Sequence, residues 1–255
     1  MKDNNVNSPI VLNNVSHGYG GLAVLQNLNV KVEPGEFVVL VGPSGCGKTT
    51  LLNLLSGHIK PASGTIENGG IIRTVYQQDG LFPWLTVTEN INMGLRSIRN
   101  GATRAKELRE LFELINLYEF KDHYPHELSG GMRQRVELAR VLAGESDILL
   151  MDEPFSALDY QTRLRLRNEL NRLLVKRPRT VIFVTHDIEE AAQLADRVLV
   201  LSNRPATISK ELLINAKRPR DPTHPAVIEA MRAILEELGL QTKNVTTEIN
   251  PIYTT

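Results

Sequence analysis

The first forty residues show apolar patterns typical of β-strands. Residues 10–15 and 28–32 alternate apolar with polar side chains, as half-buried strands do, and residues 37–41 form an uninterrupted apolar run. Pro34-Gly35 marks the turn before that run. The pattern predicts an antiparallel β layer followed by a buried strand.

From residue 81 to about residue 143 the pattern becomes helical. Apolar residues recur at spacings of three and four with charged residues between them, as at Leu108, Leu111, Phe112 and Ile115. We therefore predict amphipathic helices over this stretch.

Buried strands return after the helical stretch. Apolar runs at residues 148–151, 180–184 and 198–201 predict three of them, and we expect the last to close the sheet. Between the first two, a predicted helix from residue 161 carries an apolar stripe that we assign to the core, namely Leu166, Leu170, Leu173 and Leu174. A final amphipathic helix ends near Gly239. Strands alternating with helices indicate an α/β protein.

Composition narrows the class of protein. A chain of 255 residues can bury the core of one large domain, and it shows no internal repeat. Lys plus Arg equals Asp plus Glu at 29 each, so no global basic excess indicates nucleic acid, although a local basic face is still possible. The single cysteine excludes an intrachain disulfide. No apolar run has the length of a membrane span, and we expect a soluble, cytosolic protein.

The stretch Gly42 to Thr50, GPSGCGKTT, fits the phosphate-loop pattern and follows the apolar run that such a loop requires. Its members are Gly42, Pro43, Ser44, Gly45, Cys46, Gly47, Lys48, Thr49 and Thr50. Backbone N–H groups at the start of a helix favour phosphate, Lys48 can reach the outer phosphates, and the Thr49 hydroxyl can hold Mg²⁺. The alternative is a Gly-rich turn. Cys46 is either a small loop residue or a catalytic thiol.

Three further strand ends carry polar residues. Asp152-Glu153 follows an apolar strand, and because neighbouring side chains point to different sides, Asp152 can face Mg²⁺ while Glu153 faces the attacking water. Gln77 could touch Mg²⁺ and that water, and His186 could hydrogen-bond a transferring phosphate oxygen. A solvated glutamine and an ordinary loop histidine are the alternatives for the last two.

Four further stretches have both a structural and a functional interpretation. Ser129-Gly130-Gly131 before a helix from Met132 is a second anion-binding layout, or an N-cap serine with a glycine turn. Tyr19, which we expect on a flexible glycine loop, could stack on adenine or pack at a strand end. For Trp84 we favour packing over a partner-docking role. The basic stretch at residues 217–220 suggests a solvated linker.

In sequence order, these motifs resemble the nucleotide-binding subunit of an ABC transporter, over about residues 10–202. GPSGCGKT resembles the P-loop, LSGGM at 128–132 the family signature, ILLMDE at 148–153 the Walker B strand, and SALD at 156–159 the D-loop. Tyr19 resembles the adenine-stacking aromatic, Gln77 the Q-loop glutamine, and His186 the switch histidine.

The resemblance implies a fold. It is that of a P-loop NTPase of the ABC ATPase type, with a RecA-like core, an N-terminal antiparallel β subdomain and an inserted α-helical subdomain. A single domain would span residues 1–255, with the helical subdomain at about 86–143 and a short C-terminal extension at about 203–255.

The resemblance also implies an ATP hydrolase that works as a head-to-tail pair with a second copy or a homologous subunit. Ser129, Gly130, Gly131 and Asp159 would then act in trans on the nucleotide bound by the partner. Mg²⁺ would be held by Thr49, Gln77 and Asp152. Glu153 would be the general base or water orienter, and Gln77 and His186 would position water and the γ-phosphate.

The implied partners are transmembrane permease subunits and, indirectly, a periplasmic solute-binding protein, with the chain at the cytoplasmic face of the bacterial inner membrane. We expect no nucleic acid. LSGGMRQR, LFPWLTV and KRPRDPTHP resemble the bacterial importers of nitrate, sulfonate, taurine and bicarbonate, which implies a small anionic solute without naming it. Met132 stands where a glutamine usually follows the glycines, and its side chain cannot make the hydrogen bonds of that amide.

Two rival functions remain. An ABC ATPase can act mechanically in nucleic-acid maintenance, cluster assembly or cell-wall control, but repair and translation relatives usually carry large insertions or tandem cassettes, and this chain has neither. A P-loop kinase or GTPase would leave LSGGM unexplained, and the guanine-reading signature is missing.

Overall fold

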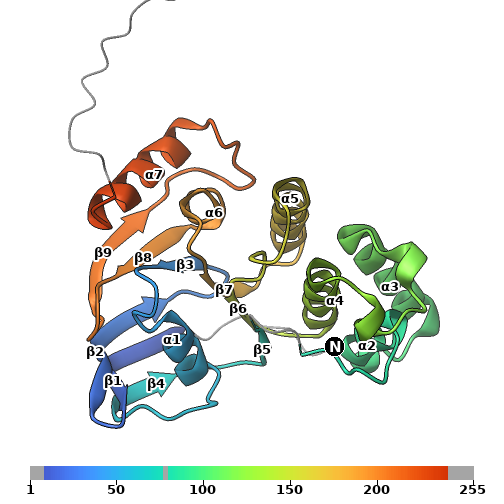
Figure 1. Cartoon of the computed structure of the whole chain (residues 1–255), viewed down its shortest axis with the longest axis horizontal. Coiled ribbons are helices and arrows are strands. Elements are labelled where there is room, and N and C mark those ends of the chain that lie inside the picture. The colour runs from blue at the N-terminus through green and yellow to red at the C-terminus, as the bar shows by residue number, and fades with distance from the viewer. Residues whose placement is uncertain (1–8, 77–79, 241–255) are drawn as a thin grey trace, which may run out of the picture.

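The computed structural model of the protein describes residues 9–76 and 80–240, and its strands form two sheets (Figure 1). The smaller sheet is antiparallel, with the order β2-β1-β4, and consists of β1 (Ile10–Tyr19), β2 (Leu22–Val32) and β4 (Ser63–Glu67). The predicted antiparallel layer is therefore confirmed, but its hairpin is longer than the alternation indicated.

Tyr19 is the last residue of β1 and pairs with Leu22 across the hairpin turn, so the expected flexible loop is wrong at this position. Gly20 and Gly21, with φ of 54° and 86°, supply the left-handed backbone of that turn. Local glycine content suggested a loop, and strand pairing prevailed over it.

The larger sheet has the order β5-β6-β7-β3-β8-β9. Its strands are β3 (Phe37–Val41), β5 (Ile72–Val75), β6 (Ile148–Asp152), β7 (Thr180–Val184), β8 (Arg197–Leu201) and β9 (Ile208–Leu213). The first five in spatial order are parallel, and all of these except β5 carry the continuous apolar runs typical of parallel strands. The expectation that residues 198–201 close the sheet is wrong, because β9 pairs antiparallel with β8 and forms the edge. Strand β9 was not predicted, because its sequence, ISKELL, has no continuous apolar run and its residues are only partly buried or exposed.

Seven helices and three short 3₁₀ turns lie in the described part of the chain. They are α1 (Lys48–Leu55), α2 (Val87–Gly94), η1 (Leu95–Ser97), α3 (Gly101–Ile115), η2 (Tyr118–Phe120), η3 (Pro125–Glu127), α4 (Gly130–Ala143), α5 (Tyr160–Lys176), α6 (Ile188–Leu194) and α7 (Pro225–Glu237). Helix α1 lies between the two sheets, while α2, α3 and α4 gather at one end of the molecule (Figure 1). The helical prediction for residues 81–143 is confirmed.

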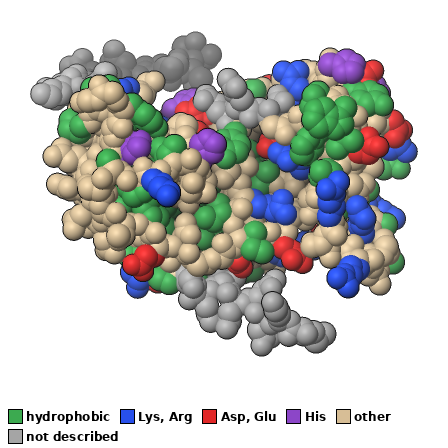
Figure 2. Space-filling view, turned by 90° about the horizontal axis from the view of Figure 1, so that it is seen from below, with side chains coloured by type: hydrophobic (Ala, Val, Ile, Leu, Met, Phe, Trp, Pro, Cys, Tyr) green, Lys and Arg blue, Asp and Glu red, His purple; other side chains and the backbone are tan. Residues whose placement is uncertain are grey.

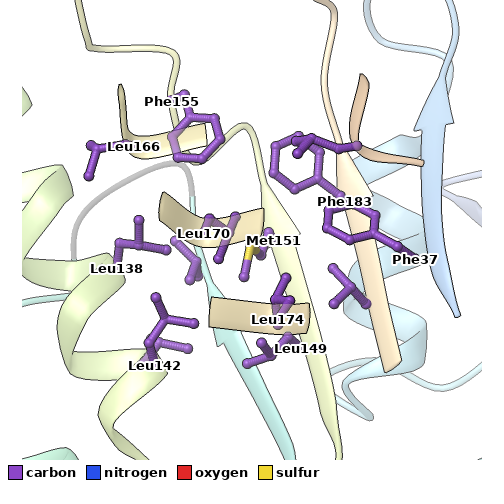
Figure 3. Packing of buried hydrophobic residues seen from close by; sticks show 14 of the residues in the cluster. Phe37, Leu138, Leu142, Leu149, Met151, Phe155, Leu166, Leu170, Leu174 and Phe183 are labelled. Atoms are coloured by element: carbon purple, nitrogen blue, oxygen red, sulfur yellow. The ribbon is translucent and has the colours of Figure 1, made fainter. Parts of the chain in front are cut away.

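Both faces of the large sheet are buried. Val38 and Leu40 of β3 join the apolar cluster of α1 and the small sheet, whereas Phe37 and Val39 join the cluster on the other face. In Figure 3, Leu149 and Met151 of β6 pack against leucines of α4 and α5. The predicted stripe of α5 is core, with Leu173 partly buried and its other three members buried. This packing fixes the strand that ends in Asp152.

Trp84 is 69% exposed and contacts the Phe82 ring, with centroids 5.7 Å apart, so the expected packing is wrong. It follows Pro83 in the turn before α2, where the side chain has little core to enter.

The basic stretch at residues 217–220 is also not a solvated linker. Arg220 is only 6% exposed and donates hydrogen bonds to the carbonyl oxygens of Gln193, Ala195, Ile214 and Ala216. These carbonyls end α6 and flank β9, so the guanidinium ties the C-terminal segment to the sheet. The charge of this stretch alone had suggested that its side chains would be solvated.

The surface carries charges of both signs. In the view of Figure 2, Lys and Arg side chains gather mainly on the right, with acidic side chains among them. None of the helices in residues 9–76 and 80–240 is both long and apolar enough to cross a membrane.

Candidate functional site

The ends of the parallel strands meet at a cavity of about 520 Å³. Ten of the predicted residues line it: Tyr19, Gly42, Ser44, Gly45, Gly47, Lys48, Thr49, Thr50, Glu153 and His186. These residues come from four separate segments of the chain, and the fold brings them to one place.

The phosphate loop runs from the end of β3 to the start of α1. Among the described residues no side chain caps this helix at Gly47, so its first N–H groups are free to bind a ligand. Gly47 has φ of 123°, and a Cβ there would lie 2.8 Å from a methyl carbon of Val24. Only glycine lets the loop approach β2 this closely.

Lys48 is 8% exposed, and its Nζ donates to the carbonyl oxygens of Gly42 and Pro43 at 2.8 and 3.0 Å. These two bonds hold the Lys48 ammonium group against the phosphate loop. Cys46 is buried in the apolar cluster of α1, and this burial favours the small structural residue over the thiol nucleophile.

Asp152 ends β6 and is 4% exposed. Burial raises the pKa of its carboxyl group and the charge of Glu153 raises it further, against a hydrogen bond from the Thr49 hydroxyl and the charge of Lys48, which lower it. A hydroxyl and a buried carboxylate side by side are hard oxygen ligands of the kind that Mg²⁺ takes together with nucleotide phosphates. The described residues contain no cluster of three or more His, Cys, Asp or Glu side chains that could hold a metal by themselves. Mg²⁺ bound jointly with phosphate fits this pair.

Glu153 lies just past Asp152, with φ of 48°, and donates its backbone N–H to Val184 of β7 at 3.0 Å. After this left-handed turn the Glu153 side chain lines the cavity. Oε2 of Glu153 lies 3.2 Å from Nδ1 of His186, which follows β7 and is 65% exposed. The contact was not predicted: it leaves the other ring nitrogen of His186 available to a ligand.

The structure does not bring every predicted residue to this cavity. Gln77 lies outside the described residues. Ser129 caps α4 by accepting the Met132 N–H at 3.3 Å, and Asp159 caps α5 by accepting the Thr162 N–H at 3.0 Å. Both caps are exposed. Gly130 and Gly131 open α4, and a Cβ at Gly131 would lie 3.0 Å from the carbonyl oxygen of Ala157.

Two residues of this region were not anticipated. Gln134 of α4 is 6% exposed; its Nε2 donates to the carbonyl oxygen of Glu153 at 3.1 Å, and its Oε1 accepts from the Ala157 N–H at 3.1 Å. It connects the Ser129 helix to the Glu153 turn. Arg204 lines the cavity from the turn after β8. Its position after a strand next to β3 was a signal that could have pointed to it.

Comparison with known families agrees with this geometry, since residues 25–156 match the family model described as "ABC transporter". The chain belongs to this family. It is an ABC-type ATPase, with the cassette fold that its two sheets and helical region display.

Similar proteins carry several names. An uncharacterized ABC transporter ATP-binding protein of Methanocaldococcus jannaschii is 44% identical over 84% of this chain and 84% of its own length. An aliphatic sulfonates import ATP-binding protein of Rhodococcus jostii is 43% identical over 81% of this chain and 83% of its own. A nitrate import ATP-binding protein of a Synechocystis strain is 44% identical over 77% of each.

The solved structures include a bacterial ABC transporter cassette, MJ0796, in a dimeric form. It is 33% identical to this chain with a TM-score of 0.73, and the match covers 82% of this chain and 100% of the cassette. A second structure of that cassette, in a post-hydrolysis state with ADP and Pi, has a TM-score of 0.71 at 31% identity over the same shares.

Proposed function

We propose that this chain is the ATP-hydrolysing subunit of an importer for a small anionic solute, acting as a head-to-tail dimer beneath permease subunits at the cytoplasmic face of the membrane. The observation that carries the proposal is the division of the machinery. The phosphate loop, Glu153 and His186 share one cavity, while the Ser129 cap points to solvent. A second copy is needed to bring that cap to a nucleotide.

In this proposal, the free N–H groups of the loop and Lys48 bind the phosphates, and Tyr19 stacks on the adenine. Tyr19 is 51% exposed and lines the cavity, so its ring face is open to a base. Thr49 and Asp152 would hold Mg²⁺, with Gln77 as a further ligand, and the ion would neutralise charge on the outer phosphates.

Glu153 takes the role of general base or water orienter. Its carboxylate faces the cavity and is positioned by His186 and, through the backbone, by Gln134. Such a carboxylate can accept a proton from water as that water attacks the γ-phosphate. The His186 ring is exposed, and with both nitrogens protonated it would donate to Glu153 through Nδ1 and to a phosphate oxygen through Nε2.

Across the dimer, Ser129, Gly130 and Gly131 approach the γ-phosphate bound by the partner, and Asp159 lies near that interface. Anion binding at the start of α4 would use the N–H groups of Gly130 and Gly131, since the Ser129 side chain caps the Met132 N–H. Closure then requires ATP, because only ATP contacts both halves, and hydrolysis reopens the pair.

The solute class rests on relatives named for nitrate and aliphatic sulfonates import, both of which are small anions. Selectivity belongs to the permease and to a periplasmic solute-binding protein, since this chain has no site for the solute in the proposal. Closure of the dimer would act on the permease subunits, and this coupling is how ATP hydrolysis would drive import.

The proposal is tested first on the enzyme. Glu153→Gln should bind ATP as the wild type does and lose at least about a hundredfold in turnover, while Gln161→Ala, an exposed change on α5, should alter neither. Turnover close to wild type in Glu153→Gln would remove Glu153 from this role.

The transport step is tested by purification from the native membrane. Recovery of a polytopic membrane protein together with this chain supports import. Recovery of nucleic acid or a soluble assembly complex instead would favour the non-transport alternative.

A further inference from the structure

We propose that Arg204 is a second phosphate-binding cation of this chain, one that contacts the outer phosphates of the nucleotide over the loop formed by Gly42 to Gly47. The inference rests on the proposed nucleotide site and adds a residue to it. The phosphate-loop motif does not include Arg204, which lies more than 150 residues further along the chain.

The first observation is the contact between Arg204 and the middle of the loop. A Cβ built on Gly45 would lie 2.7 Å from Nη2 of Arg204, so the guanidinium occupies the space that glycine leaves open. Gly45 has φ of 72° and is exposed, and both residues line the cavity. The guanidinium is therefore placed where the loop backbone faces a ligand.

The second observation is that the turn carrying Arg204 is anchored on both sides. Thr207 donates its N–H to the Ser202 hydroxyl at 3.0 Å, and Ser202 donates its N–H to the Thr207 carbonyl oxygen at 3.0 Å. Ala206 donates to the carbonyl oxygen of Val24 at 2.8 Å and is itself fully buried. Val24 also lines the cavity, so the turn is fixed relative to the nucleotide site.

The third observation is electrostatic. Lys48 already donates to two loop carbonyls and is nearly buried, whereas Arg204 is exposed. Within residues 9–76 and 80–240, no carboxylate or carbonyl group is bonded to the Arg204 guanidinium. A planar cation with free donors, at the mouth of a phosphate site, has the geometry for bidentate binding of phosphate oxygens.

The test measures binding of ATP, ADP and AMP to the full chain by calorimetry, with competition for the weakest ligand. Arg204→Gln should weaken ATP and ADP about tenfold and leave AMP unchanged, because AMP lacks the outer phosphates. Arg204→Lys should recover part of the loss, and Arg99→Ala, an exposed arginine in the helical region, should show none. The ATP affinity of Arg204→Gln should also fall less steeply with added KCl.

Unchanged ATP and ADP affinity in a folded Arg204→Gln would overturn the inference, as would an equal loss for all three nucleotides, which would place the arginine on the base or ribose. Normal affinity combined with loss of dimer would also overturn it and assign Arg204 to the second copy. If Lys48→Ala bound ATP as tightly as the wild type does, that result would instead contradict the proposed nucleotide site itself.

Discussion

Gln134 offers the most direct test of how the helix that begins at Gly130 is joined to the Glu153 turn. Gln134→Leu keeps the side-chain volume but removes the donor to the Glu153 carbonyl oxygen and the acceptor for the Ala157 N–H, both at 3.1 Å. Each bond contributes about 1 kcal/mol net, so we expect a loss of about 2 kcal/mol. For a chain of this size that lowers Tm by about 4 to 8 °C.

The change should reach catalysis as well. The Glu153 carbonyl keeps its bonds to Ser156, but the turn loses its tie to α4. We expect kcat to fall about tenfold with ATP affinity unchanged, because the carboxylate is displaced rather than removed.

Calorimetric unfolding and steady-state hydrolysis measure the two effects. Gln161→Ala is the matched control, since that glutamine is exposed at the start of α5. If Gln134→Leu unfolds within about 1 °C of the wild type and hydrolyses ATP at the same rate, the contacts of Gln134 do not couple the two segments.

Two further predictions concern buried charge. Asp152→Asn should stabilise the Mg²⁺-free and nucleotide-free protein, because burial opposes the ionised form of Asp152 and raises its pKa above that of the unfolded chain. The two proteins should have equal Tm below the unfolded-state pKa, and the advantage of the variant should grow as pH rises from there and become constant above the raised pKa of the folded state. A Tm difference independent of pH would refute this assignment. The variant should also lose the additional stabilisation of the protein that Mg²⁺ gives when it is added together with ATP. Arg220→Lys should destabilise the protein by about 3 kcal/mol, because a lysine cannot donate to four carbonyl oxygens. Urea unfolding measures this loss, with Arg99→Lys as the control. A loss under about 1 kcal/mol would show that the guanidinium is dispensable.

The sequence predicted those parts of the fold whose signal is local. The apolar run before Gly42, the acidic pair after residues 148–151 and the histidine after residues 180–184 each combine a strand with its end, and the parallel sheet then places those ends together. No long-range information was needed to anticipate that Glu153 and His186 would be near the loop.

What the sequence did not reveal depends on contacts between distant segments. Gln134 is one polar residue on an amphipathic helix, and its role exists only because residues 153–157 pack against it. Nothing in the local sequence separates Arg220 from Arg204, yet Arg220 is buried among carbonyl oxygens and Arg204 is exposed beside the phosphate loop. Strand β9 and the exposed Trp84 were missed because an edge strand is half polar and a proline turn gives the ring no core to enter.

The central claim is that ATP joins two copies of this chain, each supplying the Ser129 turn to the nucleotide of the other. Small-angle scattering of Glu153→Gln with saturating ATP and Mg²⁺ tests it most directly. The account predicts a compact dimer that returns to monomers when Ser129→Arg is added or ATP is replaced by ADP. Monomers alone under saturating ATP, with nucleotide binding demonstrated in the same sample, would contradict it.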